Sequence, residues 1–197
     1  MIVLVRHGET EANRERLALG RADPPLTARG EAQAAALAAA LGAFAGTEGI
    51  RVVSSPLARA RTTAAPIAAA VGVDVEVESR LVELDYGEWD VRSFAEFPPE
   101  DLARWRRDAT FAPPGGESLV AVGARVGAWC AEVAGGPTVI AVSHVSPIKA
   151  AVLWAMDADP LLAWRMRLDV ASITRIDASG AGGQRALVGF NETSHLR

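Results

Sequence analysis

The sequence predicts an α/β fold, a three-layer α/β/α sandwich with a mostly parallel sheet. Short runs rich in β-branched apolar residues, at 2–5, 51–54 and 138–142, are typical of strands buried on both faces of a parallel sheet. Longer segments with helical signals alternate with these runs along the chain. A length of 197 residues suits a single α/β domain with its own core, so we expect one domain over 1–197.

In the N-terminal half, each predicted element has a signal at its boundary. The elements are a strand at 2–5, a polar loop at 6–23, a helix at 28–44, a strand at 51–54, a helix from Ser55-Pro56 to about Gly72, and a strand at 73–77. Thr27 is typical of an N-cap, and Ser55 followed by Pro56 predicts a capped helix start with proline at the first position. The last strand alternates apolar and acidic residues, which indicates one exposed face.

In the C-terminal half, glycine and proline separate the predicted elements. They are a charged and aromatic loop at 83–90, a helix at 94–107, a helix at 119–133, a strand at 138–142, a helix whose first turn holds Pro147 and that ends at Met156, and a hairpin of 173–176 and 186–190. A Pro-Pro-Gly-Gly break at 113–116 precedes Ser118, which is typical of an N-cap. A Gly-rich turn at 179–183 joins the strands of the hairpin.

Composition argues against several classes of protein. A net charge of −4 is not typical of a nucleic-acid binder, which is usually basic. Cys130 is the only cysteine, so an intramolecular disulfide and a cysteine-cluster metal site are excluded. No apolar run approaches the roughly 20 residues of a membrane span, and the N-terminus does not resemble a signal peptide. We therefore expect a cytoplasmic protein without nucleic-acid or membrane partners.

Two histidines are predicted to meet at one edge of the sheet. His7 and His144 each follow a predicted strand, and ligands of open α/β sheets bind beyond the carboxyl ends of the strands. Arg6 precedes His7, and Arg59 lies in the first turn of a helix that follows a third strand. One guanidinium group can donate two parallel hydrogen bonds to the oxygens of a phosphate, and a neutral imidazole can attack phosphorus. This set predicts an anion site suited to phosphoryl transfer.

The loop at 83–90 offers the acid that a leaving alkoxide needs. Glu83 is the preferred candidate, and Asp85 and Glu88 are alternatives. His7 must be neutral to attack, and we expect neighbouring arginine charges to disfavour its protonation. These roles predict a bell-shaped pH dependence on the acidic to neutral side.

Four segments, in this order, resemble the signature of the histidine phosphatase superfamily, also called phosphoglycerate mutase-like. They are Leu4-Val5-Arg6-His7-Gly8-Glu9-Thr10 with Asn13, Ser54-Ser55-Pro56-Leu57-Ala58-Arg59-Ala60 with Thr63, Glu83 with Tyr86-Gly87, and Val142-Ser143-His144. The resemblance implies that His7 is a nucleophile that forms a phosphohistidine, and that Glu83 is the proton donor. It implies a phosphate pocket of Arg6, Arg59 and His144, and no metal or cofactor. The expected substrate-binding residues are Arg6, Asn13, Gly20, Arg59, His144 and Val145.

Within the family, the segments 114–118 and 143–149 resemble the alpha-ribazole phosphatase and actinobacterial acid phosphatase branch. Members of this branch often have Trp-Glu-Gly where this chain has Trp89-Asp90-Val91. The resemblance implies a metal-independent phosphomonoesterase that acts on a small phosphorylated metabolite. It leaves the metabolite open, together with the choice between monomer and homodimer.

Two alternatives to a phosphatase remain. The segment Trp105-Arg106-Arg107 resembles part of the substrate-binding region of cofactor-dependent phosphoglycerate mutases, so a mutase is the first alternative. A non-catalytic module that binds a phosphorylated metabolite is the second. Whether Arg104, Arg106 and Arg107 contact substrate is open at this point.

Overall fold

The computed structural model describes residues 1–180 and 183–197, and these residues form a six-stranded sheet. The strands are β1 (Ile2–Arg6), β2 (Arg51–Ser54), β3 (Val75–Val77), β4 (Val139–Ser143), β5 (Ile173–Asp177) and β6 (Ala186–Glu192). Their order across the sheet is β3-β2-β4-β1-β5-β6. The first four in this order pair in parallel, whereas β5 is antiparallel to both β1 and β6. The predicted mostly parallel sheet and the terminal hairpin are confirmed.

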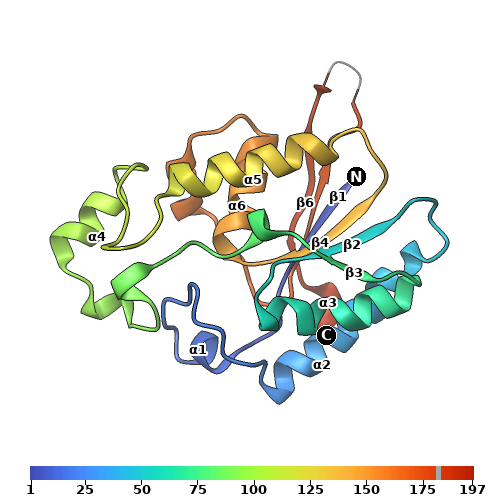
Figure 1. Ribbon diagram of the computed structural model, residues 1–197, viewed down its shortest axis with the longest axis horizontal. Coiled ribbons are helices and arrows are strands. Elements are labelled where there is room, and N and C mark those ends of the chain that lie inside the picture. Colours follow the sequence, from blue (N-terminus) through green and yellow to red (C-terminus); the bar gives the residue numbers. More distant parts are fainter. Residues whose placement is uncertain (181–182) are drawn as a thin grey trace.

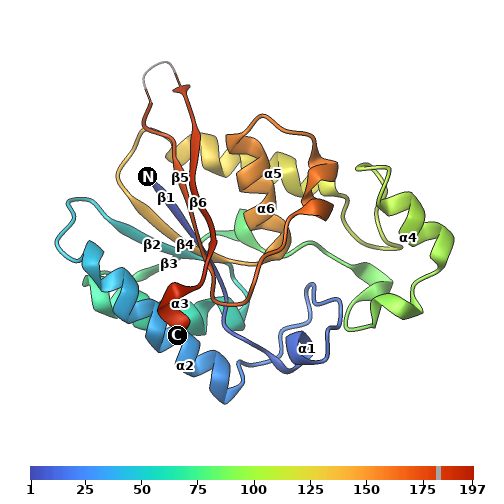
Figure 2. The ribbon, with the colours of Figure 1, turned by 180° about the vertical axis from the view of Figure 1, so that it is seen from behind.

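Helices cover both faces of the sheet, which confirms the three layers (Figures 1 and 2). The helices are α1 (Glu11–Arg14), α2 (Ala28–Leu41), α3 (Ala58–Val71), α4 (Pro99–Trp105), α5 (Leu119–Val133) and α6 (Val145–Ala155). Val3 and Val5 of β1 belong to the apolar cluster that includes α2 and α3. Ile2 and Leu4 belong to the cluster that includes α5 and α6. Because side chains alternate across a strand, β1 needs apolar residues on both of its faces, which explains the unbroken apolar run from Ile2 to Val5.

The segment between β3 and α5 lies beyond the end of the sheet and carries α4 (Figure 1). The prediction of one helix over 94–107 is wrong. The chain forms a 3₁₀ turn at Phe94–Glu96, is extended at Pro98, and then enters α4 at Pro99. Neither proline can donate a backbone hydrogen bond, so a helix cannot continue through this pair.

Two other predicted boundaries need correction. β3 begins at Val75 instead of residue 73, because the N–H of Val73 donates to Ala68 of α3 and still belongs to the helix end. Ser55 is not the cap of α3, which begins at Ala58. The cap is supplied from a distant loop: the carboxylate of Asp23 accepts hydrogen bonds from the N–H groups of Ala58 at 2.5 Å and Arg59 at 3.4 Å.

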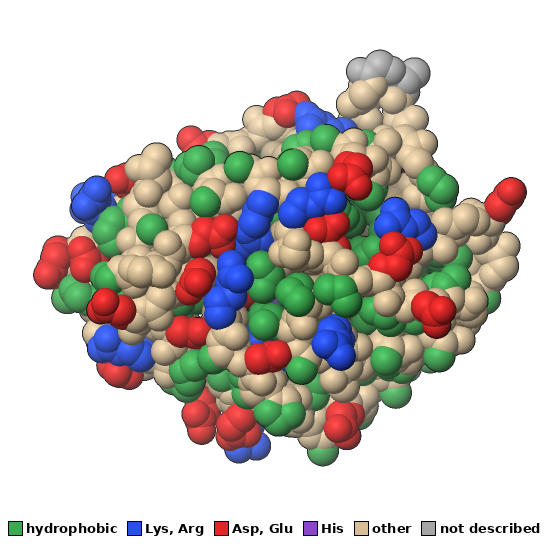
Figure 3. Space-filling model, in the orientation of Figure 1, with side chains coloured by type: hydrophobic (Ala, Val, Ile, Leu, Met, Phe, Trp, Pro, Cys, Tyr) green, Lys and Arg blue, Asp and Glu red, His purple; other side chains and the backbone are tan. Residues whose placement is uncertain are grey.

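Part of the predicted turn at 179–183, residues 181 and 182, lies outside the described residues. The C-terminus lies beside α2, where Leu196 packs against the apolar cluster (Figure 2). No helix in the described part of the chain is long and apolar enough to traverse a bilayer. Acidic and basic side chains are interspersed on the face shown in Figure 3.

Candidate active site

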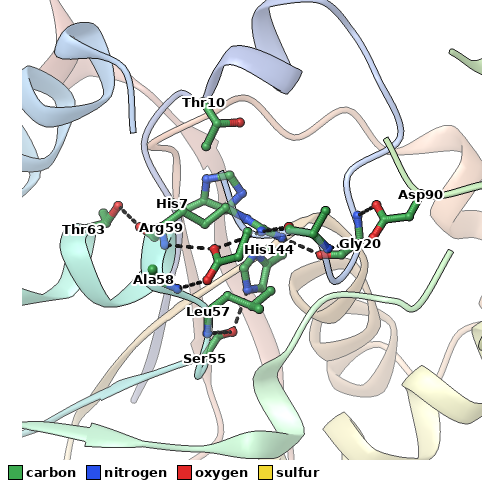
Figure 4. A network of polar contacts seen from close by, with 12 residues as sticks. His7, Thr10, Gly20, Ser55, Leu57, Ala58, Arg59, Thr63, Asp90 and His144 are labelled. Atoms are coloured by element: carbon green, nitrogen blue, oxygen red, sulfur yellow. Dashed lines mark hydrogen bonds and ion pairs between the residues drawn. The ribbon is translucent and has the colours of Figure 1, made fainter. Parts of the chain in front are cut away.

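The parallel pairing of β1 and β4 brings the two histidines together. Arg6 lies opposite Ser143 in the register of the two strands, so His7 and His144 follow at the same edge. Their ring centroids are 5.1 Å apart and their planes are inclined by 57° (Figure 4). The predicted meeting of His7 and His144 is confirmed.

The ring of His7 is buried and one of its nitrogens is fixed. Nδ1 lies 2.7 Å from the carbonyl oxygen of Gly8. A carbonyl can only accept, so Nδ1 carries the hydrogen and Nε2 keeps a free lone pair. Burial, followed by the charges of Arg59 and Arg6, lowers the pKa of His7 well below its ordinary value of 6.5. The neutral ring can therefore act as a nucleophile at Nε2.

The ring of His144 is held by Ser55. His144 Nε2 lies 2.7 Å from Ser55 Oγ, and both residues are fully buried. Ser55 Oγ also accepts the N–H of Leu57 at 3.3 Å, so its own hydrogen can be donated to Nε2. That arrangement places the hydrogen of the imidazole on Nδ1, which has no partner among the described residues. Burial is the largest cause that lowers the pKa of His144 well below its ordinary value of 6.5, and the electrostatic interaction with His7 and with the charge of Arg59 adds to it.

Arg59 is fully buried, and its two terminal nitrogens hold a loop. One donates to the carbonyl of Ala22 at 2.6 Å and pairs with Asp23 at 3.3 Å, and the other donates to the carbonyl of Gly20 at 2.8 Å (Figure 4). Burial lowers the pKa of Arg59, and the charges of Glu83 and Asp23 oppose this shift. Its Nε has no partner in the described part of the chain.

Asp90 clamps the same loop from the other side. Its carboxylate accepts the N–H groups of Gly20 and Ala22, each at 2.7 Å. Asp90 and Asp23 thus position Arg59, and no motif in the sequence predicts a role for either residue. The presence of Trp89-Asp90-Val91, where related phosphatases often have Trp-Glu-Gly, is a signal that could have indicated Asp90. Gly20 is needed for close packing, since a Cβ there would lie 2.8 Å from the carbonyl oxygen of Leu84.

Arg6 completes a set of unsatisfied donors. One terminal nitrogen of Arg6 donates to the carbonyl of Leu168 at 2.6 Å. Burial lowers the pKa of its guanidinium to about 10, and Glu83 partly offsets this. Within the described residues, Arg6 Nε, Arg59 Nε and His144 Nδ1 are all buried without a partner. Buried donors are rarely left unpaired, so these three nitrogens beside His7 mark an anion site.

Glu83 is one of two carboxyl groups, with Asp169, that line the cavity beside His7. It is 3% exposed, and its carboxylate accepts the N–H groups of Val145 at 3.0 Å and Ser146 at 3.1 Å, at the start of α6. Asp85 and Glu88 do not line that cavity. Of the three candidates, the structure therefore places only Glu83 in the same cavity as His7.

The cavity has a volume of about 450 Å³. Its lining residues are Arg6, His7, Asn13, Arg16, Leu17, Ala18, Leu19, Glu83, Tyr86, Phe94, Val145, Asp169 and Val170. Of the predicted substrate-binding residues, the lining includes Arg6, Asn13 and Val145, and it does not include Gly20, Arg59 or His144. Arg104, Arg106 and Arg107 are exposed and lie outside the lining. Among the described residues, no three His, Cys, Asp or Glu side chains form a metal-ligand cluster.

Comparison with known proteins identifies close relatives along the whole chain. A model of the histidine phosphatase superfamily (branch 1) matches residues 2–193. The bifunctional protein Rv2228c of Mycobacterium tuberculosis is 40% identical over 99% of this chain, which spans 54% of that protein. The chain thus covers about half the length of its mycobacterial relative. The probable phosphoglycerate mutase GpmB of Salmonella paratyphi B is 38% identical over 89% of this chain and 84% of its own.

Two solved structures have the same fold. The mycobacterial glucosyl-3-phosphoglycerate phosphatase Rv2419c in complex with VO3 has a TM-score of 0.87 at 30% identity, covering 98% of this chain and 99% of its own. A putative alpha-ribazole-5'-P phosphatase from Escherichia coli has a TM-score of 0.81 at 28% identity, covering 97% and 95%. The predicted fold, and the predicted likeness to phosphatases of this kind, are confirmed. The chain belongs to the histidine phosphatase superfamily.

Proposed function

We propose that this domain is a metal-independent phosphomonoesterase that acts on a small phosphorylated metabolite through a phosphorylated His7. The observation that carries the proposal is the set of three unpaired buried donors, on Arg6, Arg59 and His144, beside a neutral His7. Such donors stabilise the charge on a phosphoryl group during transfer. A cytoplasmic location and the lack of nucleic-acid and membrane partners remain predictions.

The reaction takes place in two steps. In the first, His7 Nε2 attacks phosphorus, the bond from phosphorus to the ester oxygen breaks, and Glu83 donates its proton to the leaving oxygen. In the second, the Glu83 carboxylate takes a proton from water, which attacks phosphorus and breaks the bond to Nε2. Inorganic phosphate leaves, and both His7 and Glu83 return to their starting states.

Hydrolysis of an aryl phosphate in excess EDTA tests this function. We expect full activity in EDTA, and a loss of at least about 10³-fold in His7→Ala, because no other group replaces the nucleophile. Acid quenching with a ³²P-labelled substrate should trap a phosphoenzyme in the wild type only. An active His7→Ala enzyme would contradict the mechanism, and inactivation by EDTA would contradict the metal-free reaction.

Glu83→Gln tests the proton donor. The variant should slow the release of a poor leaving group, an alkoxide, much more than that of an activated phenolate such as 4-nitrophenolate. Glu88→Gln, an exposed neighbour outside the cavity, is the matched control and should retain wild-type activity. Equal losses for both leaving groups would assign Glu83 a different role.

The similarity to GpmB supports a second candidate, a phosphoglycerate mutase. The position of Arg106 and Arg107 outside the cavity argues against it, since the resemblance to mutases depended on that segment. Conversion of 3-phosphoglycerate to 2-phosphoglycerate, dependent on a bisphosphate primer, would favour the mutase. Release of inorganic phosphate alone would favour the phosphatase. Failure to trap any phosphoenzyme would favour a binding module.

A further inference from the structure

Away from the phosphate-binding end, the walls of the cavity are mostly apolar. Leu17, Leu19 and Val170 line it together with the aromatic rings of Tyr86 and Phe94. These side chains form most of the lining that the catalytic residues do not form. The leaving group of a substrate bound at His7 must therefore lie against them.

The aromatic part of this wall is packed from behind. Tyr86 contacts Phe94 edge to face, with ring centroids 6.4 Å apart, and contacts the buried Trp105 in the same way at 5.7 Å. Trp105 in turn packs against Trp164 at 4.7 Å. Rings held in this way present a preformed apolar surface to a ligand, so little ordering is needed on binding.

Two further charged residues line the main cavity, Asp169 and Arg16, and both are poorly placed to bind an anionic leaving group. The Asp169 carboxylate already accepts hydrogen bonds from Asn191 at 2.9 Å and Arg167 at 3.0 Å. Arg16 is exposed, where a single ion pair contributes little to binding. Arg104, Arg106 and Arg107 lie elsewhere.

A smaller cavity of about 130 Å³ extends the apolar surface. It shares Tyr86, Phe94 and Val145 with the main cavity, and Trp105 and Trp164 also line it. Both indole N–H groups are buried without a partner among the described residues, and they offer uncharged donors.

The smaller cavity also contains one cationic group, the ammonium of Lys149. It donates to the carbonyl of Ala163 at 2.9 Å, and burial lowers its pKa. One N–H of Lys149 is therefore engaged by the backbone, and the side chains around it are mostly aromatic or apolar.

We propose that this site selects phosphomonoesters whose alcohol carries an aromatic or similarly large uncharged apolar group, and that Tyr86 and Phe94 recognise this group. Phosphoglycerate-like substrates, whose alcohol carries a carboxylate, are disfavoured. The inference rests on the proposed function, and it specifies the substrate class of the same site.

Binding of phosphonates, which cannot be hydrolysed, tests the preference independently of catalysis. We compare 3-phenylpropylphosphonate with 3-carboxypropylphosphonate on the wild-type protein by titration calorimetry. The phenyl compound should bind at least tenfold more tightly, since one buried ring supplies that much. Equal affinities, tighter binding of the carboxylate, or no binding of either compound below millimolar concentrations would overturn the proposal.

Phe94 variants locate the preference. Phe94→Ala should weaken binding of the phenyl compound about tenfold and leave the carboxylate compound within twofold, whereas Phe94→Leu should retain most of the affinity. Val120→Ala removes an exposed apolar side chain outside the main cavity, and should change neither affinity. A wild-type preference that survives Phe94→Ala unchanged would overturn the role of Phe94.

Turnover then separates this inference from the proposed function. 2-Phenylethyl phosphate and glycerol 3-phosphate both release a primary alkoxide, so their kcat/KM ratio reports recognition more than leaving-group chemistry. The ratio should exceed about 10. Hydrolysis of both esters at equal kcat/KM would overturn the substrate class and leave the phosphatase standing. Preferential binding of the phenyl phosphonate without hydrolysis of either ester would support the recognition of an aromatic group and contradict the phosphatase function.

Discussion

The two ends of the cavity are built differently. At the phosphate end, Arg6 is the last residue of β1, and His7 and His144 directly follow β1 and β4; backbone or side-chain partners hold each of them. At the other end, the aromatic part of the wall, Tyr86 and Phe94, comes from a segment over 86–111 that contains no strand and only short helical pieces. Phe94 there is 37% exposed, whereas Arg59 and His144 are fully buried.

This contrast separates chemistry from recognition. The groups that we propose to stabilise the transition state are fixed at the end of a parallel sheet, where their geometry is most reproducible. The groups that we propose to contact the leaving alcohol lie on an irregular segment, which can vary without disturbing the sheet. Substitutions at the phosphate end should therefore change kcat, and substitutions in the aromatic wall should change KM.

After the loss expected for His7→Ala, the largest effect is expected for Arg59→Lys. An ammonium cannot hold Gly20, Ala22 and a phosphate oxygen at once, so we expect kcat/KM to fall about 10²- to 10³-fold. Steady-state kinetics on an aryl phosphate measures the loss. Arg61→Lys, an exposed change on the same helix, should have no effect. A loss below threefold for Arg59→Lys would remove Arg59 from the phosphate site.

Ser55→Ala should have the next largest effect. Without the hydroxyl that fixes His144, both ring tautomers become populated, and kcat should fall about 10- to 100-fold. Long-range ¹H–¹⁵N spectra should show the hydrogen on Nδ1 in the wild type and on both nitrogens in the variant. Ser54→Ala, which removes a neighbouring buried hydroxyl, should leave the tautomer unchanged. An unchanged His144 spectrum in Ser55→Ala would refute the positioning role.

The two buried histidines should make the fold sensitive to acid. Their folded pKa values lie below 6.5, so the unfolded chain binds more protons at acidic pH. Their contribution is present above pH 6.5 and is lost as pH falls from 6.5 toward the folded pKa values, by about 1.4 kcal/mol per pH unit for each histidine. Urea unfolding at pH 7.0 and 5.5 measures the slope. His144→Gln should reduce it, and an unchanged slope would contradict the assignment.

The smallest effect concerns the backbone next to Asp90. Val91 has φ near 60°, which a β-branched residue rarely adopts, and it is 45% exposed. Val91→Gly should raise the free energy of unfolding by about 1 kcal/mol and leave kcat/KM unchanged. The control is Val77→Gly, at an exposed strand position, which should destabilise the protein. Destabilisation by Val91→Gly would show that the side chain matters more than the strain.

The sequence by itself predicted the sheet, its terminal hairpin and the pairing of His7 with His144. These features depend on local patterns. Buried strands appear in the sequence as apolar runs, and residues that directly follow parallel strands all lie at the carboxyl edge of the sheet. The motif at Glu83 likewise predicted a carboxyl group at the site, and the structure places Glu83 in the lining of the cavity beside His7. The broken helix at Pro98 could also have been predicted, since two adjacent prolines interrupt any helix.

Tertiary structure alone decided how the site is held together and what its walls are made of. Asp23 reaches Arg59 across 36 positions in the chain, and Ser55 reaches His144 across 89. No local pattern predicts such hydrogen bonds, because each partner has an equally plausible local role as a cap or a surface group. The same holds for the arginines at 104, 106 and 107, which the fold leaves outside the cavity, and for Tyr86 and Phe94, which it places inside. Which side chains line a cavity depends on packing between distant segments, and packing is not a property of any one of them.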